Sequence, residues 1–161
     1  MEQRIVHPLA PLHDAHSRLL VLGTMPSPRS RETGFYYGHP QNRFWPALAG
    51  VFGEPVPADN AEKAALALRH GVALWDVLHS CRIVGASDAS IREPVPNDIA
   101  GLLQATGIRR VYTTGTAAAR YYARFCEPET HIPAVPLPSP SAANARMRLA
   151  ELVEAYGVLR D

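Results

Sequence analysis

One stretch of the sequence, residues 23–45, gathers side chains that could take part in chemistry. It reads G-T-M-P-S-P-R-S-R-E-T-G-F-Y-Y-G-H-P-Q-N-R-F-W and so combines arginines, two adjacent tyrosines, a histidine and an asparagine. A loop of this length inside a small domain is usually either functional or disordered, and the aromatic residues argue against disorder. We therefore predict that residues 23–45 form part of a functional site.

Asp76 is a second candidate for chemistry, because it interrupts the otherwise apolar run at residues 72–78. Burying a carboxylate is unfavourable unless the group is paired or used. One interpretation is an ion pair with a buried arginine, such as Arg43 or Arg82. The other, which we prefer, is a role in the site.

The elements that must position these residues follow from apolar runs and turn signals. Strands are predicted at residues 18–22, 72–78, 109–114 and 132–137. Strands that alternate with helices over short links imply parallel strands joined by right-handed crossovers. We therefore predict the α/β class, with a three-layer α/β/α sandwich around a central four-stranded, mainly parallel sheet. At 161 residues with 47% hydrophobic content, the chain fits a single domain, residues 1–161.

Helical patterns separate and follow the strands. The helices are predicted to start near Asn42, at Asp59 or Asn60, at an Asn97 cap, at Ala117 and at about Ala142. Residues 1–17 read as an irregular lead-in and residues 79–96 as a polar, turn-rich loop. Open α/β sheets bind ligands at the carboxyl ends of their strands. Residues 23–45, 76–88 and 137–141 should therefore converge on one cleft.

Composition says little about partners, because the formal net charge is only +1. The positive side chains are almost all arginine, with Lys63 the only lysine. This bias suits phosphate recognition, and a high genomic GC content would also produce it.

Cys81 and Cys126 form no C-x-x-C motif, so we predict buried free thiols, no metal site and no cofactor. Since the sequence contains no signal peptide and no apolar run near 18 residues, we expect a cytoplasmic protein without a membrane segment.

Four motifs in order carry a family resemblance. They are G-T-M-P-S after the first strand, F-Y-Y-G-H-P-Q-N-R-F-W downstream, L-W-D-V at the second strand, and L-P-S-P-S-A-A-N-A after the last one. Together they resemble the uracil-DNA glycosylase superfamily, and their combination is most similar to its sixth family, the hypoxanthine-DNA glycosylases. The resemblance runs from about residue 18 to residue 146.

The resemblance implies a monofunctional DNA glycosylase of base excision repair. Such an enzyme flips a deaminated base out of DNA and hydrolyses its N-glycosidic bond, here with hypoxanthine preferred and uracil or xanthine second. The implied partner is double- or single-stranded DNA containing a damaged base, and we expect a monomer. The alternatives are a mismatch-type uracil-DNA glycosylase of the same fold, a damaged-DNA-binding module without catalysis, and an N-ribohydrolase acting on free nucleosides.

The resemblance also implies catalytic roles. Asn42 is expected to place the attacking water, whereas several related families use an Asn or Asp at the position that Met25 occupies here. The alternative is that Asn42 only caps the helix that follows. His39 is expected either to donate to the leaving base or to hold the loop, and Asp76 to act in the site.

Substrate-binding roles follow from the same motifs. Tyr37 is expected to stack on the flipped base, with Tyr36 facing the opposite way, and the alternative is a core aromatic. Ser27, Ser139 and Ser141 are expected to grip phosphates. Leu137 stands where related families carry His or Asn, and Ser141 where some carry a leucine that fills the gap left by the flipped base. The remaining expected substrate-binding residues are Gly23, Thr24, Met25 and Pro26.

Overall fold

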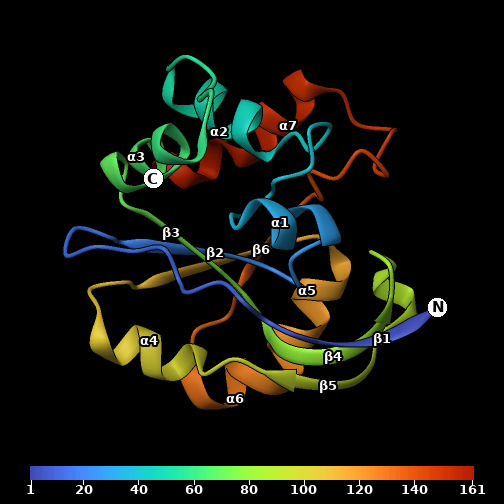
Figure 1. Ribbon diagram of the computed structural model, residues 1–161. Coiled ribbons are helices and arrows are strands. Elements are labelled where there is room, and N and C mark those ends of the chain that lie inside the picture. Colours follow the sequence, from blue (N-terminus) through green and yellow to red (C-terminus); the bar gives the residue numbers. More distant parts are fainter.

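The computed structural model describes residues 1–161 and is built around a four-stranded parallel sheet (Figure 1). Its strands are β2 (Leu19–Gly23), β3 (Val72–Asp76), β6 (Arg110–Thr114) and β7 (Val135–Leu137), in the order β3-β2-β6-β7. The central strand β2 is an uninterrupted apolar run whose leucine and valine side chains are fully buried. Such a run is typical of a parallel strand covered on both faces.

Helices cover the two faces of this sheet and divide the core in two. One face packs against α2 (Phe44–Phe52), α3 (Asn60–Arg69) and α7 (Leu149–Tyr156), and the other against α4 (Ile99–Ala105) and α5 (Thr116–Tyr121). Side chains of β2 alternate between the two cores, with Leu19 and Val21 in one and Leu20 and Leu22 in the other. The predicted three-layer α/β/α arrangement is therefore confirmed.

A second sheet, which the sequence analysis missed, packs beside the first. It is antiparallel and consists of β1 (Glu2–Val6), β4 (Leu78–Val84) and β5 (Arg92–Pro96), in the order β1-β4-β5. The predicted irregular lead-in over residues 1–17 is wrong for residues 2–6, which form β1, and holds for residues 7–17 apart from an isolated bridge at Leu12. The predicted loop over residues 79–96 is wrong, because β4 and β5 occupy most of it. Strand β1 is mostly exposed and carries no apolar run, and its partner β4 lies far away in the sequence.

Several helix boundaries also differ from the predictions. The last helix starts at Leu149 rather than near Ala142, and Asp98 rather than Asn97 caps α4. The helix predicted from Ala117 begins one residue earlier as α5 and continues through a π-helical turn, Tyr122–Cys126, into α6 (Glu127–Thr130). The short α1 (Pro28–Thr33) and the 3-10 turns Asp88–Ser90 and Gly157–Arg160 were not predicted.

Arg43 explains why residues 142–148 stay out of the last helix. Its guanidinium donates to the backbone carbonyls of Ser141, Asn144 and Met147, and its backbone N-H donates to the carbonyl of Pro140. These bonds tie the loop before α7 to the start of α2.

None of the helices combines the length and the apolar character needed to cross a lipid bilayer.

Candidate active site

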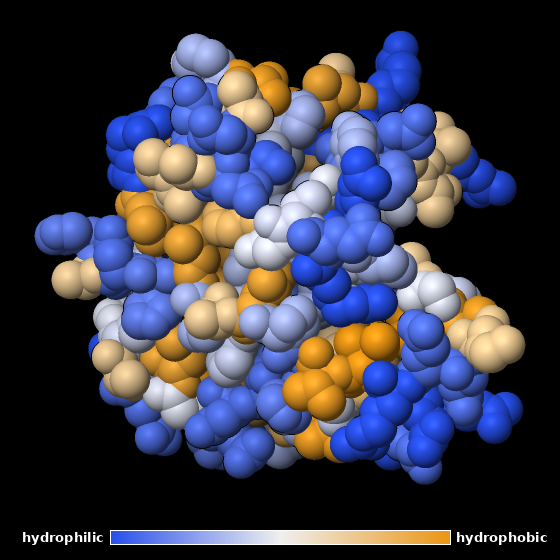
Figure 2. Space-filling view, in the orientation of Figure 1, coloured by the Kyte–Doolittle hydropathy of each residue, from blue (hydrophilic) through white to orange (hydrophobic).

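A cavity of about 160 Å³ opens at the carboxyl ends of the parallel strands. Its inner wall is formed by Gly23, Asp76 and Thr114, which end three neighbouring strands, β2, β3 and β6. In a space-filling view the molecule is hollowed at its right edge, between the loop leading into α7 and the loop between β4 and β5 (Figure 2). The full lining comprises Gly23, Thr24, Met25, Pro26, Ser27, Ser30, Tyr36, Tyr37, Asn42, Asp76, Ala86, Asp88, Thr114, Ser139, Pro140 and Ser141.

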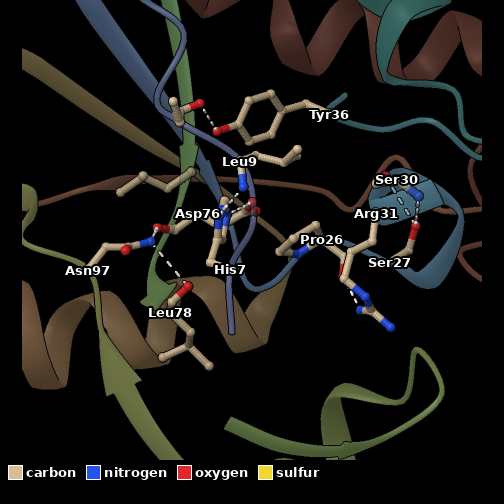
Figure 3. A network of polar contacts seen from close by, with 12 residues as sticks. His7, Leu9, Pro26, Ser27, Ser30, Arg31, Tyr36, Asp76, Leu78 and Asn97 are labelled. Atoms are coloured by element: carbon tan, nitrogen blue, oxygen red, sulfur yellow. Dashed lines mark hydrogen bonds and ion pairs between the residues drawn. The ribbon is translucent and has the colours of Figure 1, made fainter. Parts of the chain in front are cut away.

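Asp76 is buried in this wall, and its partner is a histidine that the sequence analysis did not consider. Asp76 Oδ2 lies 2.7 Å from His7 Nε2 (Figure 3). The proposed arginine partners are wrong, because Arg43 binds backbone carbonyls and Arg82 lies on the surface beside Glu93. The backbone around Asp76 is fixed as well, since Asn97 Nδ2 donates to the carbonyl of Asp76 at 2.9 Å.

Gly23 is required by the close approach of Asp76. A Cβ atom at Gly23 would lie 2.6 Å from Asp76 Oδ1, a distance that real Cβ atoms do not tolerate. The glycine also hydrogen-bonds across the strands, because its carbonyl accepts from the N-H of Val77 at 2.8 Å. The end of β2 therefore leaves space for the carboxylate oxygen that His7 does not bind.

The two tyrosines of the loop both line the cavity. The Tyr37 ring stacks on Phe44 with centroids 4.0 Å apart, and its hydroxyl lies 3.1 Å from Thr114 Oγ1. The hydroxyl of Tyr36 donates to the carbonyl of Ala10 at 2.7 Å. The two hydroxyls therefore bind different parts of the chain, and Tyr37 adopts a left-handed backbone, with φ of 53°. Burial, reinforced by the Asp76 carboxylate, raises the pKa of both phenols, so both stay protonated at neutral pH.

Asn42 lines the cavity at the start of α2. Its Oδ1 accepts the N-H of Phe44 at 2.9 Å, so the amide does satisfy a free donor at the helix start. An amide oxygen has two lone pairs and its NH2 has two donors. One acceptor position and the NH2 group therefore remain for a ligand.

A comparison with known protein families identifies the family to which the chain belongs. A model of the uracil DNA glycosylase superfamily matches residues 10–160. The chain belongs to this superfamily. The resemblance found in the four motifs is thereby confirmed.

Two hypoxanthine DNA glycosylases from Methanosarcina species are similar to this chain over most of its length. The hypoxanthine DNA glycosylase of Methanosarcina acetivorans is 33% identical over 137 residues, which cover 83% of this chain and 84% of that protein. The hypoxanthine DNA glycosylase of Methanosarcina barkeri is 32% identical over 113 residues, which cover 69% and 72% of the two chains.

A solved structure supports the same fold. It is the solution NMR structure of a candidate uracil DNA glycosylase from Methanosarcina acetivorans, with a TM-score of 0.82 and 26% sequence identity. The match covers 99% of this chain and 98% of that one.

Two of the residues expected in the glycosylase site lie outside the cavity lining. His39 is exposed, its Nδ1 accepts the N-H of Gln41 at 3.1 Å, and it borders a neighbouring open hollow that also touches Ser27 and Ala86. Leu137 is buried in the core beneath α2 and α7. The other eleven expected residues all line the cavity.

The rim serines make local turn bonds. Ser27 accepts the N-H of Ser30 at 3.2 Å and so caps α1, while Ser139 Oγ accepts the N-H of Ser141 at 3.2 Å. Ser30 Oγ in turn accepts the N-H of Gly38 at 2.9 Å, which links α1 to the loop before α2. These bonds fix the rim without using every lone pair of the hydroxyl oxygens.

Five lining residues were not predicted from the sequence: Ser30, Ala86, Asp88, Thr114 and Pro140. Thr114 could have been found, because it ends a predicted strand at the same sheet edge as Gly23. Asp88 lies in the segment 76–88 that was expected to reach the cleft, but nothing singled out its side chain. Its Oδ2 lies 3.4 Å from Thr24 Oγ1, and burial raises the pKa of its carboxyl group.

The structure contains no group of three or more His, Cys, Asp or Glu side chains that could hold a metal ion. Cys81 and Cys126 are free and buried. Burial raises the pKa of both thiols, that of Cys126 to about 12, so neither is a reactive thiolate at neutral pH.

Proposed function

We propose that this member of the superfamily is a DNA glycosylase that removes hypoxanthine from DNA by hydrolysis. The observation that carries the proposal is the convergence of Tyr37, Asn42 and Asp76 on one cavity at the carboxyl ends of the strands. Two similar proteins that bear the name hypoxanthine DNA glycosylase support the choice of base. A base buried in duplex DNA cannot reach such a cavity, so the nucleotide must be flipped out.

Tyr37 is the proposed stacking surface for the flipped base. Phe44 packs against one face of its ring and Thr114 holds its hydroxyl, so the ring is fixed before a ligand arrives. Stacking of a base on an aromatic side chain is worth about 1–3 kcal/mol. This contribution suits a base of any hydrogen-bonding pattern, which is why the base preference must come from the polar groups around it.

Asn42 and Asp76 are the proposed catalytic residues. As the glycosidic bond breaks, the base leaves with the bonding electrons and the sugar gains positive charge. The free lone pair of Asn42 Oδ1 can hold a water for attack, although an amide cannot remove its proton as a base. The carboxylate of Asp76, fixed in a buried wall, can stabilise the developing positive charge.

The rim residues Ser27, Ser139 and Ser141 are the proposed phosphate contacts. They stand on loops on both sides of the cavity, and hydroxyl and backbone N-H groups commonly position the DNA backbone in this way. The protein is proposed to work as a monomer, since a single chain supplies the whole lining.

An abasic-site assay tests the proposed function. Labelled oligonucleotides with one hypoxanthine, uracil or xanthine are incubated with the protein in EDTA and then treated with alkali, which cleaves at abasic sites. We expect cleavage of the hypoxanthine strand, because the mechanism uses a water and side chains alone. Loss of turnover in EDTA with recovery on adding zinc or magnesium would contradict the mechanism.

Further arms of the same assay separate the alternatives. Faster cleavage of uracil opposite guanine than of hypoxanthine would indicate a mismatch-type uracil-DNA glycosylase. Release of base from free deoxyinosine but not from DNA would indicate a nucleoside hydrolase. Binding of damaged DNA without any abasic product would indicate a binding module.

A further inference from the structure

His7 is buried next to the proposed catalytic carboxylate and lies on a segment that no family motif covers. Its side chain is 1% exposed, and that of Asp76 is 6% exposed. The backbone N-H of His7, the residue after β1, donates to the carbonyl of His79 in β4 at 2.6 Å, one position beyond the Val6–Ser80 pair. The antiparallel sheet therefore delivers this imidazole to the end of β3.

The hydrogen bonds of His7 define which ring nitrogen carries the proton. Nδ1 lies 3.2 Å from the backbone nitrogen of Leu9, which is a donor, so Nδ1 must accept. The proton of a neutral imidazole then sits on Nε2 and points at Asp76 Oδ2, 2.7 Å away (Figure 3). His7 thus uses one nitrogen to hold the backbone and the other to hold the carboxylate.

This contact leaves the two oxygens of Asp76 in different surroundings. Oδ2 is held by His7, whereas Oδ1 faces Gly23, where a Cβ atom would lie only 2.6 Å away. The aromatic rings of Tyr36 and Trp75 flank the imidazole, with centroids 6.3 Å and 6.5 Å from it. The ring is therefore enclosed, and its orientation sets the orientation of the carboxylate.

We propose that His7 is a positioning residue that holds the Asp76 carboxylate so that Oδ1 serves the reaction in the cavity. The inference rests on the proposed glycosylase function. It assigns a purpose to the strands of the antiparallel sheet, none of whose residues lines the cavity. It also identifies a residue outside the four motifs on which the rate should depend.

A set of variants tests the positioning role. His7→Phe removes the donor while keeping a ring, and His7→Gln keeps an N-H near the position of Nε2. The matched control is His13→Phe, the same change at an exposed histidine of the same segment. Single-turnover rates on hypoxanthine DNA, the dissociation constant for that DNA and the melting temperature are measured for each protein.

We expect His7→Phe to lower the single-turnover rate by about 10- to 100-fold, the range for a misplaced reacting group, with DNA affinity changed only a few-fold. His7→Gln should recover most of the lost rate, and His13→Phe should match the wild type. In the Asp76→Asn background, His7→Phe should lower the rate little further, because the two residues act through one group. Additive rate losses, or no rescue by glutamine in a folded protein, would overturn the positioning role.

A spectroscopic arm does not depend on activity. Nitrogen-15 spectra of the histidine side chains should show His7 with its proton on Nε2, and this signal should shift in Asp76→Asn. A His7 signal with the proton on Nδ1 would overturn the inference. If the wild type showed the expected His7 signal but did not cleave hypoxanthine DNA, the proposed function would be wrong. If the wild type were active and His7→Phe cleaved at the same rate, only the positioning role would be wrong.

Discussion

The inner wall of the cavity and its rim are built in different ways. The inner wall, Gly23, Asp76 and Thr114, belongs to strand ends that are hydrogen-bonded to their neighbours and buried against the two cores. The rim, Ser27, Asp88, Ser139 and Ser141, belongs to loops held by short turn bonds at the surface. A fixed wall suits chemistry, where small displacements are costly, and a loop-borne rim suits contact with a flexible DNA backbone. Substitutions in the wall should therefore change rates, whereas rim substitutions should change the preferred DNA context.

The largest effect is expected at Asn42, which extends the inner wall from the start of α2. Asn42→Ala should lower the single-turnover rate by about 100-fold or more, because a group that places the water acts mainly in the transition state. Affinity for hypoxanthine DNA should stay within a few-fold of the wild type. Met25→Ala, at a neighbouring lining position without a suitable acceptor, should leave the chemical step largely intact.

Asn42→Ala also removes the acceptor for the Phe44 N-H, so stability must be measured in parallel. Asn42 stands one residue before the N-cap, Arg43, and losing one hydrogen bond of this kind costs about 0.5–1.5 kcal/mol. Asn42→Asp keeps an acceptor and should restore the melting temperature. If a well-folded Asn42→Ala protein cleaved at nearly the wild-type rate, the catalytic role would pass to Asp76.

A smaller, selective effect is expected at Ser141 on the rim. Glycosylases commonly push an apolar side chain into the gap that a flipped base leaves, and Ser141 is too short and polar to fill it. The wild type should therefore act faster on a lesion in a single strand or mismatch than in a stable pair. Ser141→Leu should raise the rate on the stable pair several-fold and the rate on single strands less.

Single-turnover rates on one lesion in three contexts measure the Ser141 effect. Equal wild-type rates in single strand, mismatch and stable pair would show that another residue already fills the gap. If Ser141→Leu did not raise the rate on the stable pair more than the rate on single strands, another residue would again be filling the gap. The rim would then not set the preferred DNA context at this position.

The sequence predicted the residues of the inner wall better than the residue that holds Asp76 in place, His7. Strands β2 and β3 were found because both are mainly apolar; Gly23 ends β2, and Asp76, which was predicted inside a strand over residues 72–78, ends β3. His7 could not be found, because β1 is mostly exposed and the contact to Asp76 spans 69 positions of sequence. Propensity and periodicity describe local structure, and they carry no information on which distant polar group pairs with a buried carboxylate.

The rim shows the same limit in another form. The motif spacing placed Ser139 and Ser141 at the cavity, but it also placed His39 and Leu137 there, and both lie outside the lining. Leu137 ends the short strand β7 and its apolar side chain is buried in the core. A motif aligns backbone positions, whereas the direction of each side chain depends on local backbone angles and packing.

The smallest effect is expected at Asp88, whose pKa is raised by burial and by the Asp76 carboxylate, against the opposing effects of Thr24 and Arg120. A raised pKa means that the folded state binds the proton more tightly than the unfolded chain, so stability falls as pH rises from the unfolded pKa of Asp88 to its folded value. Asp88→Asn should therefore raise the melting temperature slightly at pH 7. The gain should vanish below the unfolded pKa of an aspartate, about 3.9.

Thermal unfolding of both proteins across this pH range measures the Asp88 effect. A gain of the same size at pH 3 and at pH 7 would show that the substitution acts through packing rather than charge. A lower melting temperature at pH 7 would show that the folded protein stabilises the Asp88 carboxylate.

Arg43 joins parts of the chain about one hundred residues apart, and this has a consequence for motion. Its guanidinium bonds to the carbonyls of Ser141, Asn144 and Met147 leave the loop before α7 no independent hinge. Local opening of that loop must break contacts at the start of α2, beside Asn42, and segments linked in this way open as one cooperative unit. Amide hydrogen exchange should then report one shared opening rate for residues 42–44 and 141–147, and ordering of the loop on a DNA backbone should slow exchange around the catalytic amide as well.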